Sequence, residues 1–305
     1  MKTIDELNRR YGAAGRIVFR TGFAGYPEVV LANKYGVAEV ALLGGNVLSY
    51  RPTGHSPVLF RSAKRDYNRG EAIHGGMPVC WPQFGNRAIA KMAQHGFARV
   101  SLFTVRGSVY SEDMTEVTLG LTSTDETRQI WPHDFDLELK ISVSMKLNAA
   151  LKTKNTGQEA FAFSAGFHPY LRVAERDATE VRGVEGCEFI DASLNETAVQ
   201  GGPFLMNAAS DHVFKLPPAM KHEFALIDPK ARRAIGIAAN GNTKLVVWNP
   251  GTEWRPPDCA ADDYKKFVCV EPVTDWPEAG ITLGSGEEYT LLVAIQSTAE
   301  EGGEK

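Results

Sequence analysis

The sequence predicts an all-β protein, a large antiparallel β-sandwich with a short helix at its N-terminus. Three observations lead to this prediction. Apolar and polar residues alternate with a period of two along residues 136–147, which is the pattern of a half-buried strand. Turn sequences such as Gly44-Gly45-Asn46 and Asn155-Thr156-Gly157 separate many short apolar segments. Strands and helices do not alternate regularly, and this argues against a parallel α/β fold.

The expected elements follow in chain order. Thr3 and Glu6 have the spacing of a capping box before residues 7–11, and Gly12 can end that helix. Beyond the helix the period changes to two, so each later element is an expected strand. The strand candidates are residues 16–20, 37–43, 117–121, 136–147, 161–163, 244–248, 267–270 and 289–295.

The chain shows no internal repeat and no change of composition that would mark a linker. We therefore expect a single domain over residues 1–305, with the helix within about residues 1–15 and a frayed, charged tail at about residues 298–305.

Charge and cysteine content exclude several classes of function. The chain has 33 Lys and Arg residues against 37 Asp and Glu residues, a net charge of −4, so it lacks the basic field that binding to nucleic acid or an anionic membrane requires. No pair of its four cysteines has zinc-knuckle or redox spacing. Residues 1–6 contain no apolar segment, so we expect no secretory signal, and no apolar run in the sequence reaches about 18 residues. We expect a reduced, cytoplasmic, soluble and monomeric protein.

Four segments differ from ordinary strand and turn sequences, and two of them are loops that could approach a ligand. Residues 72–85 combine paired glycines, two prolines and Trp81, which indicates a tight loop close to another surface. A bulged corner around a buried Trp81 is the alternative. Residues 94–99 place His95 and Arg99 where they could face an anionic or hydroxyl-rich ligand, and an exposed turn is the alternative.

The other two segments supply a candidate acid/base pair. His168 lies in the apolar, aromatic segment 163–170, where burial and partners can poise an imidazole for proton transfer near neutrality. Glu271 ends an apolar strand candidate on the same face as Phe267 and Cys269, and such a carboxylate is costly to bury unless it is paired or used. For His168 the alternative is a core histidine bonded to a backbone carbonyl, and for Glu271 it is an acid at the rim of the sheet.

Motifs for other chemistries are missing from the sequence. It contains no Gly-rich phosphate loop, no Gly-x-Ser-x-Gly and no His-Glu-x-x-His. The residue types therefore indicate acid/base chemistry with no metal and no organic cofactor.

Five motifs, taken together and in order, resemble the aldose 1-epimerase superfamily in its glucose-6-phosphate 1-epimerase (hexose-6-phosphate mutarotase) branch. They are IHGGMPVCWP (73–82), QHGFAR (94–99), FHPY (167–170), VVWNP (246–250) and VEP (270–272), and the resemblance covers about residues 30–297. It implies a β-supersandwich fold.

The resemblance also implies a reaction, the interconversion of the α and β anomers of a hexose 6-phosphate, glucose 6-phosphate above all. It implies that Glu271 is the general base and His168 the general acid, with no cofactor. The residues that it implies as substrate contacts are His74, Gln94, His95, Arg99, Asp211, Trp248 and Asn249.

The departure of most consequence from the family pattern is at His74, and Gln83 also stands where an aromatic residue is common. His74 stands where the family has an arginine that helps to hold the 6-phosphate, and an imidazole is a weaker, pH-dependent phosphate partner. A mutarotase for a free hexose or another sugar phosphate is therefore an alternative. A carbohydrate-binding or regulatory protein without catalysis is a second alternative, although it would need neither His168 nor Glu271. A sandwich glycoside hydrolase would need two carboxylates, and the motifs supply one.

Overall fold

The computed structural model describes residues 2–64, 71–85, 92–253, 256–274 and 280–299, and it begins with the expected helix. Helix α1 (Ile4–Tyr11) has the predicted capping box: Thr3 Oγ1 accepts a hydrogen bond from the Glu6 N–H, and the Glu6 carboxylate accepts one from the Thr3 N–H. Gly12 caps its C-terminus, and the buried side chain of Leu7 attaches it to the core.

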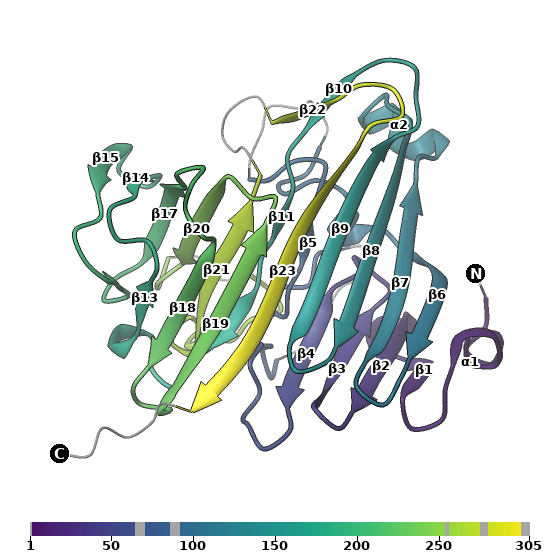
Figure 1. The fold of residues 1–305 in the computed structure, drawn as a ribbon, viewed down its shortest axis with the longest axis horizontal. Coiled ribbons are helices and arrows are strands. Elements are labelled where there is room, and N and C mark those ends of the chain that lie inside the picture. Colours follow the sequence, from purple (N-terminus) through teal and green to yellow (C-terminus); the bar gives the residue numbers. More distant parts are fainter. Residues whose placement is uncertain (1, 65–70, 86–91, 254–255, 275–279, 300–305) are drawn as a thin grey trace.

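The largest sheet among the described residues has nine strands, all paired antiparallel, and it forms the front layer in Figure 1. Its order is β16-β13-β18-β19-β23-β9-β8-β7-β6. The strands are β16 (Phe204–Leu205), β13 (Glu180–Arg182), β18 (Glu223–Asp228), β19 (Arg233–Asn240), β23 (Glu288–Ala299), β9 (Leu147–Asn155), β8 (Phe135–Val143), β7 (Thr115–Thr122) and β6 (Thr104–Tyr110).

The long alternating segment forms two strands of this sheet, so the prediction of one strand over 136–147 is wrong. Strand β8 ends at Val143 and β9 begins at Leu147, and these two residues pair directly. Between them Met145 is highly exposed at the tip of a hairpin. Directly paired residues share one face of a sheet, so Val143 and Leu147 point to the same side. The three residues between them keep apolar and polar positions in step, and the sequence pattern therefore shows no break at the turn.

A second sheet has eight strands in the order β15-β14-β17-β20-β21-β11-β5, and β12 also pairs with β21. It lies behind the nine-stranded sheet in Figure 1, as does a four-stranded sheet, β1-β2-β3-β4. The eight strands are β15 (Glu196–Val199), β14 (Glu188–Asp191), β17 (Ser210–Lys215), β20 (Lys244–Asn249), β21 (Phe267–Val273), β11 (Gly166–Phe167), β5 (Val79–Cys80) and β12 (Tyr170–Arg172). The four-stranded sheet consists of β1 (Ile17–Thr21), β2 (Pro27–Asn33), β3 (Gly36–Ala41) and β4 (Val47–Pro52). A separate two-stranded sheet consists of β10 (Phe161–Phe163) and β22 (Ile281–Leu283).

The main hydrophobic core fills the space between these layers. Val247 and Val270 of the eight-stranded sheet belong to the same buried cluster as Ile237 and Val293 of the nine-stranded sheet. The residues next to them in sequence, Val246 and Cys269 among them, form two smaller clusters on the opposite face. The eight-stranded sheet therefore has one face in the core and another that carries its own partly apolar surface.

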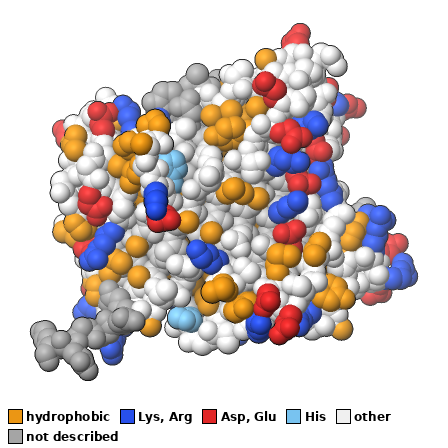
Figure 2. All heavy atoms as spheres, viewed as in Figure 1, with side chains coloured by type: hydrophobic (Ala, Val, Ile, Leu, Met, Phe, Trp, Pro, Cys, Tyr) orange, Lys and Arg blue, Asp and Glu red, His pale blue; other side chains and the backbone are white. Residues whose placement is uncertain are grey.

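The outer face of the nine-stranded sheet is polar over β8, β9 and β23. Glu138 contacts Lys140 and Lys152, and Glu288 contacts Lys152 and Lys154. In Figure 2 acidic and basic side chains alternate over this part of the sheet. Such exposed ion pairs contribute little to stability.

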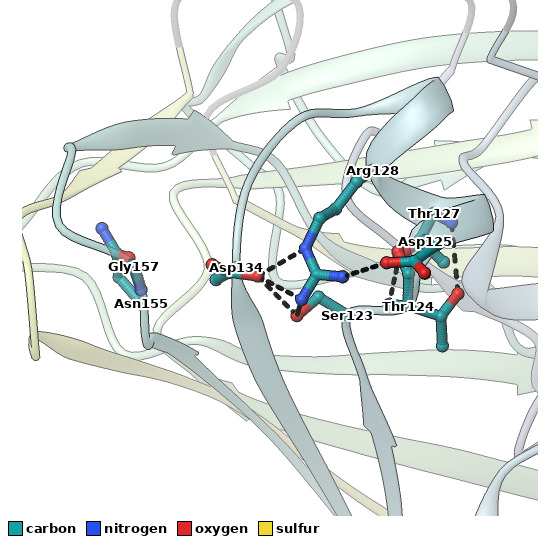
Figure 3. Close-up of polar contacts among 8 residues, drawn as sticks. All are labelled: Ser123, Thr124, Asp125, Thr127, Arg128, Asp134, Asn155 and Gly157. Carbon is teal, nitrogen blue, oxygen red and sulfur yellow. Dashed lines mark hydrogen bonds and ion pairs between the residues drawn. The ribbon is translucent and has the colours of Figure 1, made fainter.

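A second α-helix, α2 (Asp125–Ile130), was not anticipated because its apolar face is too small to give a helical period. Its N-cap Thr124 exchanges hydrogen bonds with Thr127, and Arg128 binds both Asp125 and Asp134. Figure 3 shows this network beside the turn in which Asn155 accepts from Gly157. Local polar contacts therefore specify α2. The 3₁₀ turns are η1 (Phe23–Gly25), η2 (Ala98–Val100), η3 (Arg176–Ala178) and η4 (Asp263–Lys266).

The last strand extends further than expected. Strand β23 pairs with β19 as far as Ala299, so the predicted tail does not begin at residue 298, and residues 300–305 lie outside the described part of the chain. Within that part no helix has the length and apolar character needed to cross a membrane. The single domain over residues 1–305 stays a prediction.

Candidate active site

A cavity of about 760 Å³ lies on the face of the eight-stranded sheet that points away from the main core. Its volume is within the usual range for sites that bind small molecules. The predicted site residues His74, Gln94, His95, Arg99, His168, Asp211, Trp248, Asn249 and Glu271 all line this one cavity.

Strand register explains how distant residues reach the same face. Asp211 of β17 pairs with Trp248 of β20, and Trp248 pairs with Cys269 of β21. Directly paired residues share a face of the sheet, and Glu271 lies two residues beyond Cys269, so it shares that face too. The alternation predicted for residues 267, 269 and 271 thus puts Glu271 on the face that holds the cavity, while Phe267 and Cys269 belong to a small buried cluster on that face.

Strand register also places His168 next to Glu271. Gly166 of β11 pairs with Val273, and Tyr170 of β12 pairs with Cys269. His168 lies midway between Gly166 and Tyr170, and this register places it opposite Glu271. Its Nε2 is 3.5 Å from Glu271 Oε1, which is long for a hydrogen bond.

Both members of this pair are buried and incompletely bonded. His168 is 6% exposed and Glu271 1% exposed, and within the described residues neither His168 Nδ1 nor Glu271 Oε2 has a hydrogen-bond partner. Buried polar atoms normally have partners, so two such atoms beside a cavity indicate a place where ligand groups supply the missing hydrogen bonds. The ring of His168 also stacks on Tyr170, with 4.8 Å between centroids.

Burial moves the two pKa values in opposite directions. It lowers the pKa of His168 well below the usual value, with His95 and Arg99 adding to the effect. It raises the pKa of Glu271 well above the usual value, with the nearby Asp211 adding to the effect. Desolvation therefore favours the neutral imidazole and the neutral carboxylic acid, while the contact between the two favours the ion pair.

His95 is a neutral hydrogen-bond donor. It is 8% exposed, its Nδ1 accepts a hydrogen bond from the Gly85 N–H (3.1 Å), and so Nε2 carries the ring hydrogen. Burial, helped by Arg99, lowers its pKa to about 3. The residue adopts a positive φ of 61°, and the adjacent Gly96 could not carry a side chain, because a Cβ there would lie 2.1 Å from the Trp81 carbonyl oxygen.

The part of the cavity next to His95 carries a cation. Arg99, on η2, lines the cavity and makes no hydrogen bond or ion pair with another described residue. His74 also lines it, and its Nδ1 lies 2.8 Å from Asp258 Oδ1. An unpaired guanidinium facing a cavity is suited to an anionic group such as phosphate.

Asn249 differs from the other predicted contacts because its amide already has four partners. Its Nδ2 donates to the carbonyls of Tyr264 and Phe267, and its Oδ1 accepts from Arg176 and Gly251. These use the full hydrogen-bonding capacity of an amide side chain. Asn249 therefore holds the end of β20 to the start of β21, and its substrate contact stays a prediction.

A serine, a histidine and an aspartate also meet at the edge of the cavity. Ser210 Oγ lies 3.0 Å from His212 Nδ1, and His212 Nε2 lies 3.6 Å from Asp191 Oδ2. However, Ser210 Oγ donates its own hydrogen to the Val247 carbonyl (2.8 Å), so the imidazole nitrogen is the donor to Ser210. This hydroxyl is not activated for nucleophilic attack.

Three buried side chains, two of which line the cavity, could in principle hold a metal ion. Ligand atoms of His168, Cys269 and Glu271 lie within 4.8 Å of one another. Burial raises the pKa of Cys269 well above its usual value, which favours the thiol over the thiolate that binds metals. The chemistry of this donor set is therefore better suited to proton transfer than to metal binding.

Sequence reasoning missed several residues of the site. Tyr170 and Phe84 are aromatic walls, and both lie inside motifs that were noted for other residues. The turn at residues 192–194, between β14 and β15, also lines the cavity, and nothing in the sequence distinguished it from an ordinary turn. Asp258, which contacts His74, lies 184 residues away from it.

Sequence comparisons find a matching family and several similar proteins. Residues 27–296 match the family described as "Aldose 1-epimerase". A protein of Cenchrus ciliaris named "Putative glucose-6-phosphate 1-epimerase" is 29% identical over 291 residues, which span 90% of this chain and 85% of that protein. A protein of Escherichia coli K12 with the same name is 32% identical over 239 residues, 77% of this chain and 78% of that protein.

Solved structures are similar over nearly the whole chain. The crystal structure of "a putative mutarotase" from Salmonella typhimurium has a TM-score of 0.86 and 27% identity, covering 95% of this chain and 96% of that one. A galactose mutarotase-like protein from Clostridium acetobutylicum shares the fold, with a TM-score of 0.73 and 18% identity, covering 93% of this chain and 98% of that one.

Proposed function

We propose, because this chain belongs to the aldose 1-epimerase family, that it interconverts the α and β anomers of a hexose 6-phosphate, glucose 6-phosphate foremost. The observation that supports this most directly is the Glu271 carboxyl, buried in the cavity floor with Oε2 lacking a partner among the described residues and with the His168 imidazole 3.5 Å from Oε1.

The proposed reaction needs one base and one acid. Glu271 takes the proton from the C1 hydroxyl while His168 donates a proton to the ring oxygen, so the bond from C1 to the ring oxygen breaks and an open-chain aldehyde forms. Rotation about C1–C2 then presents the other face of the carbonyl. The reverse transfers close the ring and restore both residues. General acid and base catalysis each contribute on the order of 10²–10⁴-fold.

Binding of the sugar would favour the reactive form of the pair. An ionised Glu271 beside a protonated His168 holds the same single proton as the neutral pair, so the two forms differ only in where the proton lies. The sugar hydroxyls would form hydrogen bonds with Glu271 and His168 in place of those that water would make. These bonds would lower the free energy of the ionised pair relative to the neutral pair. Neutral His95, which lines the cavity, is proposed to donate from Nε2 to a substrate oxygen.

We expect catalysis to depend weakly on pH near neutrality. Burial lowers the pKa of His168, so the pair takes up a second proton only at a pH below the ordinary pKa of histidine. Burial raises the pKa of Glu271, so the pair loses its one proton only at a pH above the ordinary pKa of glutamate. The rate constant kcat for glucose, corrected for spontaneous anomerisation, should stay within about twofold between about pH 6 and 8. An independent imidazole with a pKa of about 6.5 would instead lose roughly 20-fold of its acid form over this range, and such a profile would contradict the coupled pair.

Arg99 supports a phosphorylated substrate. It is the cavity cation for which no hydrogen bond or ion pair is found among the described residues, and hydrogen bonds to charged groups contribute about 1.5–3 kcal/mol each. Gln94, Asp211 and Trp248 line the same cavity and are proposed to contact the sugar, with the Trp248 ring packing against it.

The substitution Arg99→Ala should therefore raise KM for glucose 6-phosphate about 10-fold or more, since about 1.4 kcal/mol corresponds to a factor of ten. The KM for free glucose should change much less. Steady-state anomerisation of both sugars measures this. Arg128→Ala, on α2, is the matched control, because the partners of Arg128 among the described residues lie near α2 and outside the cavity. An equal rise for both sugars would mean that Arg99 does not contact phosphate.

The direct test of the proposed function is an anomerisation assay with pure anomers. Glucose 6-phosphate, mannose 6-phosphate, glucose and galactose should be compared by polarimetry or by NMR of the C1 proton. We expect the highest kcat/KM for a 6-phosphate. Acceleration of none of these sugars would contradict the proposal.

One observation favours a second candidate, a mutarotase for a free hexose. His74 is bonded to Asp258, and its family counterpart is an arginine, so this cavity has one permanent cation fewer at that position. The same assay separates the two candidates, because a free-hexose enzyme would show no preference for a 6-phosphate.

A further inference from the structure

The turn between β14 and β15, residues 192–194, forms one wall of the cavity at the edge of the eight-stranded sheet (Figure 1), and the proposed reaction makes no use of it. The Asp191 carboxylate fixes its shape. Its Oδ1 accepts hydrogen bonds from the Ser193 N–H (2.9 Å), the Ser193 hydroxyl (2.5 Å) and the Leu194 N–H (3.3 Å). Its Oδ2 lies 3.6 Å from His212 Nε2 on β17. The turn is therefore a preformed wall, as binding sites for small molecules usually have.

This end of the cavity combines apolar surface with a hydrogen-bond acceptor. Leu194 is 65% exposed and lines the cavity with Ala192 and Ala209, so a ligand that covered Leu194 would gain from burial of apolar surface. The Ala192 N–H donates to the Asp211 carbonyl (2.8 Å), which places Asp211 beside the turn. The Asp211 carboxylate lines the cavity without a hydrogen bond or ion pair to another described side chain, and a carboxylate only accepts.

The roles of Glu271 and His168 decide which edge of the sugar faces the turn. In a pyranose C1 lies between the ring oxygen and C2. With the ring oxygen at His168 and the C1 hydroxyl at Glu271, C2 therefore lies on the side of Glu271 that is away from His168. The sheet order is β14-β17-β20-β21-β11, and His168 lies between β11 and β12, which both pair with β21. The C2 side is thus the side of β20, β17 and the turn.

The distance to the turn exceeds what a hydroxyl at C2 can span. Strand β14 lies three strands from β21, which carries Glu271, and neighbouring strands are about 4.8 Å apart, so the turn begins roughly 14 Å from β21. A larger group at C2 would reach towards Leu194. Asp211, on β17, lies along the way and calls for a donor close to C2, with apolar atoms beyond it. An acylamino group has this order, because its N–H is attached to C2 and its methyl group is at the far end.

We propose that residues 192–194 and Asp211 form a subsite for an acylamino group at C2, so that the substrates include 2-acetamido-2-deoxyhexose 6-phosphates. This inference rests on the proposed function and extends its substrate class. Asp211 accepts a hydrogen bond from the amide N–H, and Leu194 with Ala192 covers the acyl methyl group. The acyl group takes no part in the reaction, so the proton transfers at C1 and the ring oxygen are the same as for glucose 6-phosphate.

The experiment compares anomerisation of N-acetylglucosamine 6-phosphate and glucose 6-phosphate, each corrected for the spontaneous rate. We expect the wild-type protein to accelerate both, with a KM for the N-acetyl sugar equal to or below that for glucose 6-phosphate. Leu194→Ala should raise the KM for the N-acetyl sugar about fivefold, which corresponds to about 1 kcal/mol, and should change the KM for glucose 6-phosphate much less. Leu205→Ala on β16 is the matched control, because Leu205 is also exposed and does not line the cavity.

A second variant tests Asp191 as the positioning residue of the turn. Asp191→Ala removes the acceptor for the Ser193 and Leu194 hydrogen bonds. It should raise the KM for the N-acetyl sugar about as much as Leu194→Ala does, while kcat for the same sugar stays within about twofold, because binding and not the proton transfer is affected. A purely structural role would lower the unfolding temperature without this split between KM and kcat.

Two results would overturn the inference. One is acceleration of glucose 6-phosphate without acceleration of N-acetylglucosamine 6-phosphate, because the turn would then exclude the acyl group. The other is an equal effect of Leu194→Ala on KM for both sugars. Glucosamine 6-phosphate keeps a donor for Asp211 but lacks the methyl group, so its KM should respond little to Leu194→Ala. Failure of the proposed function is a separate result, because none of the three sugar phosphates would then be accelerated.

Discussion

Replacing Glu271 by glutamine should lower kcat for anomerisation by at least about 100-fold. Glutamine keeps the shape of the side chain but cannot accept the proton of the C1 hydroxyl. The loss should appear in kcat for both free and phosphorylated sugars, because the step concerns C1 and not the 6-position. The rates of disappearance of pure α and pure β anomers measure it.

The stability of this variant provides the control. Glu271 is 1% exposed, and burial of a carboxyl without full hydrogen bonding is unfavourable, so Glu271→Gln should unfold at a temperature equal to or above that of the wild type. Glu28→Gln is a matched change of a buried acid on β2, outside the cavity, and it should retain activity. Near-normal anomer exchange by Glu271→Gln would show that Glu271 is not the base.

The substitution His168→Asn should also reduce kcat by about 100-fold or more. Asparagine retains polarity but cannot donate a proton to the ring oxygen near neutral pH. Because the acid and the base act in one step, the double variant with Glu271→Gln should be little slower than either single variant. His222→Asn is the matched control, since His222 bonds Asn242 and does not line the cavity.

The pH profile adds a test of the acid that does not depend on the size of the loss. In His168→Asn the remaining activity should follow the ionisation of Glu271 alone and rise with pH, because the base form increases as pH rises. A variant that keeps the wild-type profile and most of its rate would exclude His168 as the acid.

Several features of this protein follow from the sequence by itself. The capping box of Thr3 and Glu6 predicted α1, because its bonds join residues three apart. Alternation placed Phe267, Cys269 and Glu271 on one face, because side chains of any strand alternate. The order of five motifs indicated the family, which the match over residues 27–296 confirms.

Other features depended on how distant segments meet. The hairpin at Met145 was invisible because direct pairing of Val143 with Leu147 keeps the alternation intact. The side-chain amide of Asn249 makes hydrogen bonds to four partners, and no spacing of residues in the sequence predicts these bonds. Asp258 had no motif of its own, and its contact with His74 spans 184 residues.

The pairing of His168 with Glu271 shows the physical reason for this division. Local hydrogen bonds and side-chain periodicity are properties of a few neighbouring residues, so the sequence alone specifies them. Which strand lies beside which, and in what register, is decided by burial of the whole core and by closure of long loops. The pairing of β11 and β12 with β21 thus decides that an imidazole and a carboxyl about 100 residues apart face each other at 3.5 Å.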